Sequence, residues 1–190
     1  MVAVTSSRSL ALQSSLHQAK QALPTLLQGE ILLTVKPHTA WGAAVTAQMY
    51  VPSLCESVWQ QITDYPRWVE FLPALSRSQV VPGSVRKTET GKKLWLQQTA
   101  TKDFWLFSAS ADVELEVLEL PDYQVQFQLR SGNFTDFAAS LQLQDLEGGT
   151  WLCYSVQATP SIPIPSMFIQ QAIQLDLPAN LRQLRKVLCR

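Results

Sequence analysis

The sequence contains little of the chemistry on which most catalytic and metal sites depend. Only two histidines, His17 and His38, occur in 190 residues, and both precede the region with the strongest strand pattern. Histidine is the commonest general base and metal ligand, so a site in that region would have to use other side chains. No H-E-x-x-H, G-x-S-x-G or phosphate-binding glycine loop occurs. We therefore expect no metal and no cofactor, and we assign no catalytic residue.

Cysteine is also scarce. The three cysteines, Cys55, Cys153 and Cys189, are an odd number at wide and unpatterned spacing. They predict neither a disulfide framework nor a zinc-ligand pair, and they are typical of reduced thiols in a reducing compartment. We accordingly expect a cytoplasmic protein.

The chain has no excess of either charge and no long apolar run. Lys plus Arg and Asp plus Glu are both 15, so no cationic surface is available to neutralise a nucleic-acid backbone. No segment approaches the roughly 18 apolar residues of a membrane span. We expect no nucleic-acid binding and at most peripheral membrane contact. The oligomeric state is left open.

Residues 1–30 form a separate amphipathic extension in this interpretation, followed by one domain at 31–190. Apolar residues recur at three- and four-residue steps from Leu12 to Leu26, and Pro24 weakens the helix they predict. The helix either packs on the domain or frays in solvent. Alternatively, Arg8, Lys20 and the serines, with no acid before Glu30, are typical of a transit peptide. The location would then be an organelle stroma or matrix.

Apolar residues are abundant, and in several segments they alternate with polar residues in the pattern of a β-strand. Val113, Leu115 and Val117 alternate with acids, and Val125, Phe127 and Leu129 alternate with glutamines. A period of two places one set on each face of a sheet, so one face is apolar and the other is a glutamine-rich solvent surface. Short turns between consecutive strands favour antiparallel pairing.

A proline-rich elbow at residues 160–165 precedes one long apolar-striped helix. Its stripe runs from Ile169 to Leu188, and Pro178 is expected to kink or split it, with Asp176 as a possible new cap. The fold class is therefore α+β, a helix-grip fold in which a curved antiparallel sheet wraps around a long C-terminal helix. Two short helices follow the first strand. Space can remain between sheet and helix, opening toward the two short helices.

This arrangement resembles the START-like superfamily, and within it the polyketide cyclase/dehydrase and lipid-transport group (SRPBCC, coenzyme-Q-binding-like). The resemblance covers roughly residues 43 to 190. It rests on Val51-Pro52, Val58-Trp59, Thr63-Asp64-Tyr65, Trp68 through Pro73, Gly132-Asn133-Phe134 with Phe137, Gly149-Thr150, Tyr154, Pro163-Ile164-Pro165, Asn180-Leu181 and Leu184-Arg185. It implies a deep hydrophobic cavity for lipids, isoprenoid quinones, sterols, pigments or polyketides. Its members are carriers and a minority of enzymes, so it does not choose a reaction.

Candidate ligand-cavity residues are the inward-facing apolar and aromatic side chains together with two polar ones. They are Trp68, Phe71, Leu96, Gln98, Leu115, Phe127, Leu141, Tyr154, Phe168 and Ala172. The aromatic residues, with Trp59 and Trp95, can equally be ordinary core packing. The hydroxyl of Tyr154 needs a polar partner, and Gln98 either orients a ligand oxygen or makes a structural hydrogen bond.

These features favour a non-catalytic protein that binds or transports a hydrophobic small molecule such as a lipid, isoprenoid quinone or pigment. One alternative is a polyketide cyclase or dehydratase that uses Tyr154 or Asp64 as acid or base, although Asp64 before Tyr-Pro is typical of a turn. Another is an accessory factor that contacts a partner protein through the outer sheet or the N-terminal helix.

Overall fold

A computed structural model describes residues 14, 16–104, 107–164 and 166–189 of the chain. They form one antiparallel sheet in the order β1-β2-β9-β8-β7-β6-β5-β3, with β4 paired to β5. The strands are β1 (Leu32–Pro37), β2 (Ala43–Val51), β3 (Leu75–Val80), β4 (Arg86–Thr88), β5 (Gly91–Phe104), β6 (Phe107–Leu120), β7 (Gln124–Gly132), β8 (Phe134–Leu146) and β9 (Gly149–Pro160). The helices are α2 (Leu23–Leu27), α3 (Cys55–Ile62), η1 (Tyr65–Arg67), α4 (Trp68–Phe71), α5 (Ser166–Gln171), η2 (Ala172–Asp176) and α6 (Leu177–Leu188).

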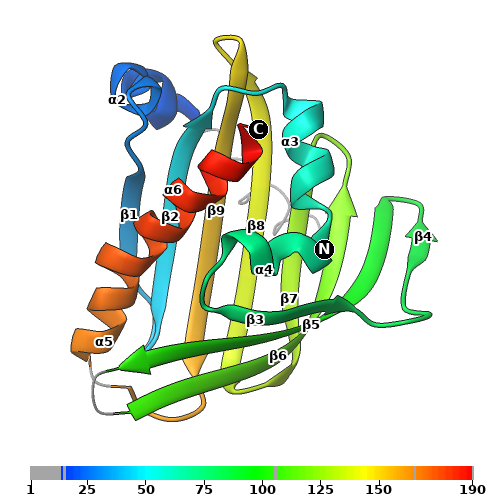
Figure 1. The fold of residues 1–190 in the computed structure, drawn as a ribbon, viewed down its shortest axis with the longest axis vertical. Helices are drawn as coiled ribbons and strands as arrows, with labels where there is room; N and C mark the ends of the chain where they lie inside the picture. Colours follow the sequence, from blue (N-terminus) through cyan, green and yellow to red (C-terminus); the bar gives the residue numbers. More distant parts are fainter. Residues whose placement is uncertain (1–13, 15, 105–106, 165, 190) are drawn as a thin grey trace.

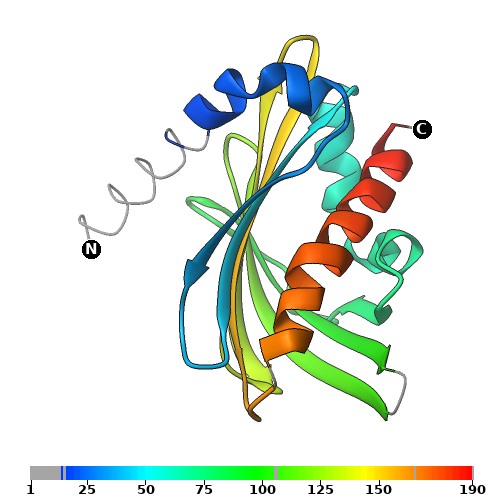
Figure 2. The ribbon, with the colours of Figure 1, turned by 90° about the vertical axis from the view of Figure 1, so that its left-hand side faces the viewer.

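The curved sheet wraps its apolar face around the C-terminal helix, while α3 and α4 cover the same face beside it (Figures 1 and 2). We call this the concave face. The antiparallel α+β helix-grip architecture is confirmed. The two short helices follow β2, so a β1–β2 hairpin precedes them. The alternation from Val113 to Leu129 does place the apolar side chains inward, because Val117 pairs with Phe127 and both are buried.

The C-terminal helix runs without interruption from α5 through α6, although Pro178 predicts a kink or a split. Residues Ala172–Asp176 form a π-helical stretch between α5 and α6. Pro178 lies in the first turn of α6, and because it has no backbone N–H it leaves one carbonyl group of the preceding turn without that donor. Asp176 holds the N-cap position of α6 and makes no side-chain capping hydrogen bond.

The N-terminal extension packs on the outer face of the sheet in its described part. Ala19 and Leu26 are fully buried there in a second apolar cluster with Tyr50, Trp151 and Cys153. Leu12 and Arg8 lie outside the described residues, and targeting by this segment stays a prediction. No helix of residues 14, 16–104, 107–164 and 166–189 is long and apolar enough to cross a membrane.

We expect Ala19→Asp to detach the extension, because a carboxylate at a fully buried position lacks the partners that water supplies. Thermolysin should then cut the segment containing Leu16 and Leu23 roughly tenfold faster, since cleavage follows the population of the open form. Gln18→Asp, at an exposed position one residue earlier, is the matched control. Equal cleavage of the two variants would show that the contact with the sheet does not hold the extension.

Candidate ligand-binding site

On five adjacent strands, β5 to β9, the inward-facing side chains become less buried toward one end of the concave face. The buried inward-facing side chains are Leu94, Leu96, Leu115, Val117, Val125, Phe127, Leu141, Leu143 and Leu152. Further along the same strands, the inward-facing side chains are only half-buried: Gln98, Val113, Leu129, Phe137, Tyr154, Val156 and Ala158. Strand pairing places these half-buried residues side by side, with Gln98 opposite Val113 and Phe137 opposite Ala158. We call this half-buried set the open end of the concave face.

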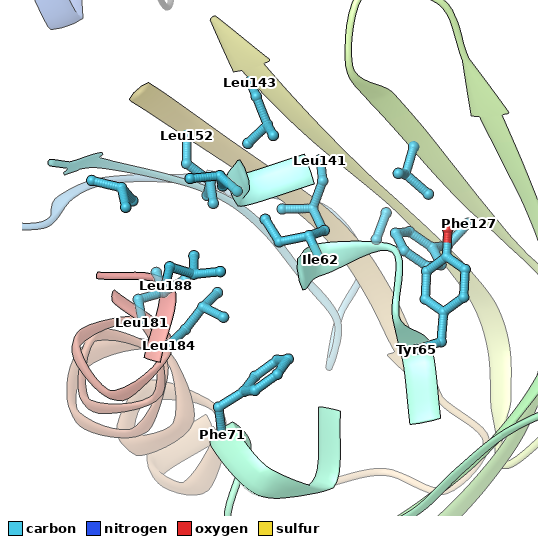
Figure 3. Close-up of a cluster of buried hydrophobic side chains, with 14 of the residues drawn as sticks. Ile62, Tyr65, Phe71, Phe127, Leu141, Leu143, Leu152, Leu181, Leu184 and Leu188 are labelled. Atoms are coloured by element: carbon cyan, nitrogen blue, oxygen red, sulfur yellow. The ribbon is translucent and has the colours of Figure 1, made fainter. Parts of the chain in front are cut away.

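The other end of the concave face is a packed core. Ile62 of α3 and Phe71 of α4 join Leu181, Leu184 and Leu188 of α6 over the strands (Figure 3). Space opening toward the two short helices stays a prediction, because Trp59 and Trp68 of these helices are only half-buried. Half-buried apolar surface also lies further along the strands.

Five predicted cavity residues belong to this packed core. They are Phe71, Leu96, Leu115, Phe127 and Leu141, each at most 5% exposed. Trp68 is half-buried beside them, with its ring centroid 5.6 Å from that of Phe127 and 6.5 Å from that of Phe71. The Trp68 indole donates a hydrogen bond of 2.8 Å to the carbonyl oxygen of Ile62, which fixes the ring.

The remaining four lie toward the open end. Gln98 and Tyr154 are half-buried on β5 and β9, and Phe168 is half-buried on α5. Ala172, the first residue of η2, is exposed. Whether any of the ten residues contacts a ligand stays a prediction.

Tyr154 places a hydroxyl among apolar side chains. Its cross-strand neighbours are Ala47 and Leu141, and its hydroxyl makes no hydrogen bond to another residue in the described part of the chain. Burial raises the pKa of Tyr154 to about 12. The hydroxyl therefore stays protonated at neutral pH and is available as a donor.

Gln98 is held by the protein itself. Its amide nitrogen donates a hydrogen bond of 3.2 Å to the Ser78 hydroxyl, which in turn donates one of 2.7 Å to the carbonyl oxygen of Tyr65. These two hydrogen bonds connect β5 to β3 and to η1. Gln98 therefore makes a structural hydrogen bond, which is one of the two roles predicted for it.

Sequence reasoning missed one inward-facing acid. Glu119 has the inward parity of Val117 on β6, and its carboxylate is buried. It accepts a hydrogen bond of 3.0 Å from the Tyr65 hydroxyl and pairs with Lys92 at 2.8 Å. Burial, followed by the charge of Glu119, raises the pKa of Tyr65. The Glu119 carboxylate therefore has two polar partners at the packed end, which is typical of a structural network.

His38, which precedes the region with the strongest strand pattern, contacts the start of β8. The His38 ring nitrogen Nε2 lies 2.6 Å from Oδ2 of Asp136 at the start of β8. Burial opposes the charge of Asp136, but hydrogen bonding from Thr159 and His38 outweighs it and lowers the pKa of Asp136. An ionised carboxylate only accepts, so His38 is the donor. No pattern in the sequence connects two residues this far apart.

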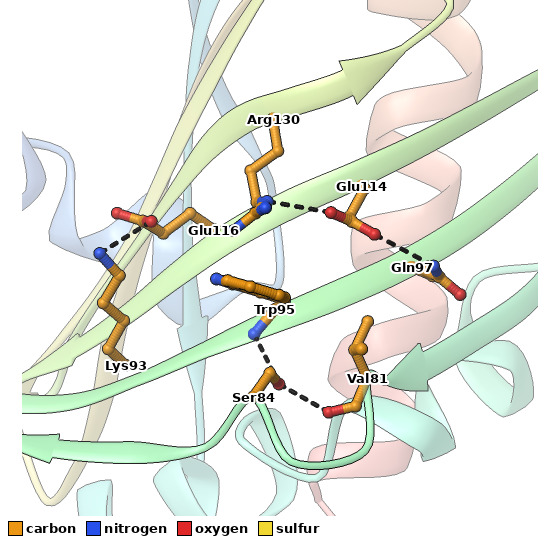
Figure 4. A network of polar contacts seen from close by, with 8 residues as sticks. All are labelled: Val81, Ser84, Lys93, Trp95, Gln97, Glu114, Glu116 and Arg130. Atoms are coloured by element: carbon orange, nitrogen blue, oxygen red, sulfur yellow. Dashed lines mark hydrogen bonds and ion pairs between the residues drawn. The ribbon is translucent and has the colours of Figure 1, made fainter.

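Trp95, one of the candidate chamber aromatics, faces the outer side of the sheet (Figure 4). The Arg130 guanidinium lies 3.5 Å from the centroid of its ring and donates to Glu114 at 2.9 Å. A cation over an aromatic face is favourable even at the surface. Trp95 therefore stabilises the outer face and does not line the concave one.

Asp64 and the thiols offer no reactive group at the open end. Asp64 is exposed beside η1, the turn that its sequence context predicts. Burial raises the pKa of Cys55 to about 11, which makes its thiol a poor nucleophile. Across the described ranges, His, Cys, Asp and Glu form no group of three or more that could hold a metal ion.

Comparison with protein families agrees with this geometry. Residues 52–185 match the model of the family described as "Polyketide cyclase / dehydrase and lipid transport". The chain belongs to the polyketide cyclase/dehydrase and lipid transport family. The matched residues run from the start of α3 into α6, so β1, β2 and the N-terminal helix precede them. No curated protein sequence matches the chain.

Solved structures share the fold of this family member at low sequence identity. A START superfamily protein from Mycobacterium smegmatis is 13% identical, with a TM-score of 0.61, over 76% of this chain and 96% of that one. A STAR-related lipid transfer protein from Xanthomonas axonopodis is 11% identical, with a TM-score of 0.58, over 83% and 99% of the two chains. The Zhui aromatase/cyclase from a Streptomyces species is 9% identical, with a TM-score of 0.61, over 77% and 93%. These similarities concern the fold, and the family includes both carriers and cyclases by description.

Proposed function

We propose that this family member binds a hydrophobic small molecule, such as a lipid, isoprenoid quinone or pigment, and does not transform it. The observation that carries the proposal is the uniform change from buried to half-buried side chains along five strands of the concave face. Apolar surface left uncovered beside a packed core is stabilised by about 25 cal/mol for each Å² that a ligand covers.

Tyr154 supplies the polar contact in this proposal. Its hydroxyl has no partner among the residues described, and it projects from the row that begins with the buried Leu152. A ligand with one oxygen near its end would accept a hydrogen bond there while its hydrocarbon part covers Val156 and Ala158. The site then selects a mostly apolar molecule with one carbonyl or hydroxyl oxygen.

The pKa of Tyr154 argues against the cyclase alternative. A general acid or base works best when its pKa lies near the operating pH. Burial holds the pKa of Tyr154 at about 12, and neither histidine nor carboxylate contacts it in the part of the chain that the structure describes. Tyr154 is thus suited to donating a fixed hydrogen bond and poorly suited to transferring a proton.

Two fluorescent probes that differ in one oxygen-bearing group test this proposal. Laurdan carries a ketone, whereas diphenylhexatriene is a pure hydrocarbon. We expect both to bind, and we expect Tyr154→Phe to weaken laurdan about fivefold to tenfold, the equivalent of one hydrogen bond. Binding of diphenylhexatriene should be unchanged, because no oxygen is involved.

Tyr123→Phe is the matched control, since the Tyr123 hydroxyl donates to Glu56 at 3.1 Å and the ring packs on Trp59. It should leave both affinities unchanged. Absence of binding of either probe to the unmodified protein would overturn the proposed function. An equal loss of both probes in Tyr154→Phe would instead remove the polar anchor from it.

A further inference from the structure

The outer face of the sheet carries a polar groove of about 520 Å³ that the proposed function does not use. One wall is the described part of the N-terminal extension, which contributes Ser14 and Gln18. This segment lies on the opposite side of the sheet from α6 (Figure 2). The other side chains come from the adjacent strands β7, β8, β9, β2 and β1. The sheet therefore separates this groove from the open end of the concave face.

Strand pairing arranges the lining side chains in rows across the sheet. In one row, Gln126 pairs with Ser140 and Ser140 with Ser155. The row continues to Thr46 and then to Thr34. Because serine and threonine are short whereas glutamine is long, the middle of this row forms a floor of hydroxyl groups beside a rim of amides.

The chemistry of the lining is neutral and rich in hydrogen-bonding groups. Six glutamines and five serines or threonines contribute to it. Lys36 is the one charged side chain in the described lining, and no aromatic ring is present there. Amide and hydroxyl side chains both donate and accept hydrogen bonds. The lining therefore matches a neutral molecule with many hydroxyl groups better than an ion or a hydrocarbon.

Gln142 supplies a second, independent observation. It lines the groove, yet its side chain is buried, with the residue only 6% exposed. Its carbonyl oxygen Oε1 has no hydrogen-bond donor among the described residues. A buried acceptor without a donor costs free energy, and native proteins rarely keep one. Rotation about the last side-chain bond, which has a broad torsional preference, turns this oxygen toward the groove.

We propose that the groove binds a neutral sugar, either as a free saccharide or as the sugar headgroup of a glycolipid. One sugar hydroxyl donates to Oε1 of Gln142, and the hydroxyl of Ser140 and the amide of Gln128 contact others. The inference does not depend on the proposed function, because the two sites lie on opposite faces of the sheet.

Two measurements distinguish the two sources of the sugar. Saturation-transfer difference NMR with maltose and the methyl glycosides of glucose, galactose and mannose reports binding of a free saccharide. Flotation with phosphatidylcholine vesicles, with and without galactosyl diacylglycerol, reports binding of a headgroup. We expect a signal in at least one of the two measurements. Absence of both would overturn the inference, whether or not the protein binds laurdan.

Gln142→Met locates the site, because methionine keeps the length of the side chain and removes the amide. We expect sugar binding to weaken about tenfold, the equivalent of one hydrogen bond. We also expect the equilibrium constant for folding, measured by urea denaturation, to rise about fivefold, since the unpaired buried oxygen is gone. A purely structural glutamine would give the opposite result, a loss of stability.

Gln144→Met is the matched control, because Gln144 lies on the same face of β8, is half-buried and does not line the groove. It should change neither sugar binding nor stability. Ser140→Phe is a second test, since a ring on the floor of the groove should abolish sugar binding and leave laurdan binding unchanged. Undiminished sugar binding in both Gln142→Met and Ser140→Phe would overturn the assignment of the sugar to this groove.

Discussion

Ala158→Trp should weaken binding of a hydrophobic probe by nearly a hundredfold while the protein still folds. Ala158 faces inward at the open end, half-buried between Ala43 and Phe137 on its neighbouring strands. An indole there occupies surface that a ligand would cover. Losing about 100 Å² of apolar contact removes about 2.5 kcal/mol, nearly a hundredfold in affinity. Titration with diphenylhexatriene measures the loss.

The stability of Ala158→Trp tests whether the open end is packed. A packed interior resists a larger side chain, and overpacking costs about 1–3 kcal/mol. At an incompletely covered site the indole should fit with less than about 1 kcal/mol of destabilisation. Gln157→Trp, one residue earlier and on the outer face, should leave binding unchanged. Full probe affinity in Ala158→Trp would show that the ligand does not occupy the open end.

Phe127→Ala, unlike Ala158→Trp, should strongly lower the stability of the protein. Phe127 is 3% exposed and packs between Tyr65 and Trp68, with ring centroids 6.3 and 5.6 Å away. Truncating a buried phenylalanine costs about 3–5 kcal/mol through lost transfer free energy and the cavity left behind. The midpoint of urea denaturation measures this loss.

Gln128→Ala is its control, because that exposed side chain points to the outer face of the same strand. It should change the free energy of unfolding by less than about 0.5 kcal/mol. A loss below about 1 kcal/mol for Phe127→Ala would contradict the description of this end as a packed core. Sequence reasoning treated Phe127 as cavity lining or core, and the structure assigns it to the core.

Most of the fold could be predicted because period-two alternation is a local property of each strand. Val113, Leu115 and Val117 show their face without knowledge of any partner strand, and the stripe from Ile169 to Leu188 does the same for the helix. Pro178 lies just after the π-helical stretch at Ala172–Asp176, but the helix passes through it without a break. Trp95 was wrongly considered for the chamber because it is aromatic. A cation, Arg130, lies over its ring and holds it on the outer face.

The site was less predictable because it depends on how far each strand is covered. Leu152 and Ala158 have the same parity on β9, yet one is buried and the other half-buried. The difference comes from where α3, α4 and α6 end over the sheet. Similarly, His38 meets Asp136 only after β1, β2 and β9 assemble beside β8. Such contacts leave no short-range pattern in the sequence.

Native mass spectrometry of the gently purified protein tests the central claim most directly. We expect the protein to carry one small apolar molecule, or to take up one equivalent of laurdan when it is purified empty. Ala158→Trp should carry none, and Gln157→Trp should behave like the unmodified protein. A folded, unmodified protein that neither retains an apolar molecule nor takes up either probe would contradict ligand binding at the open end.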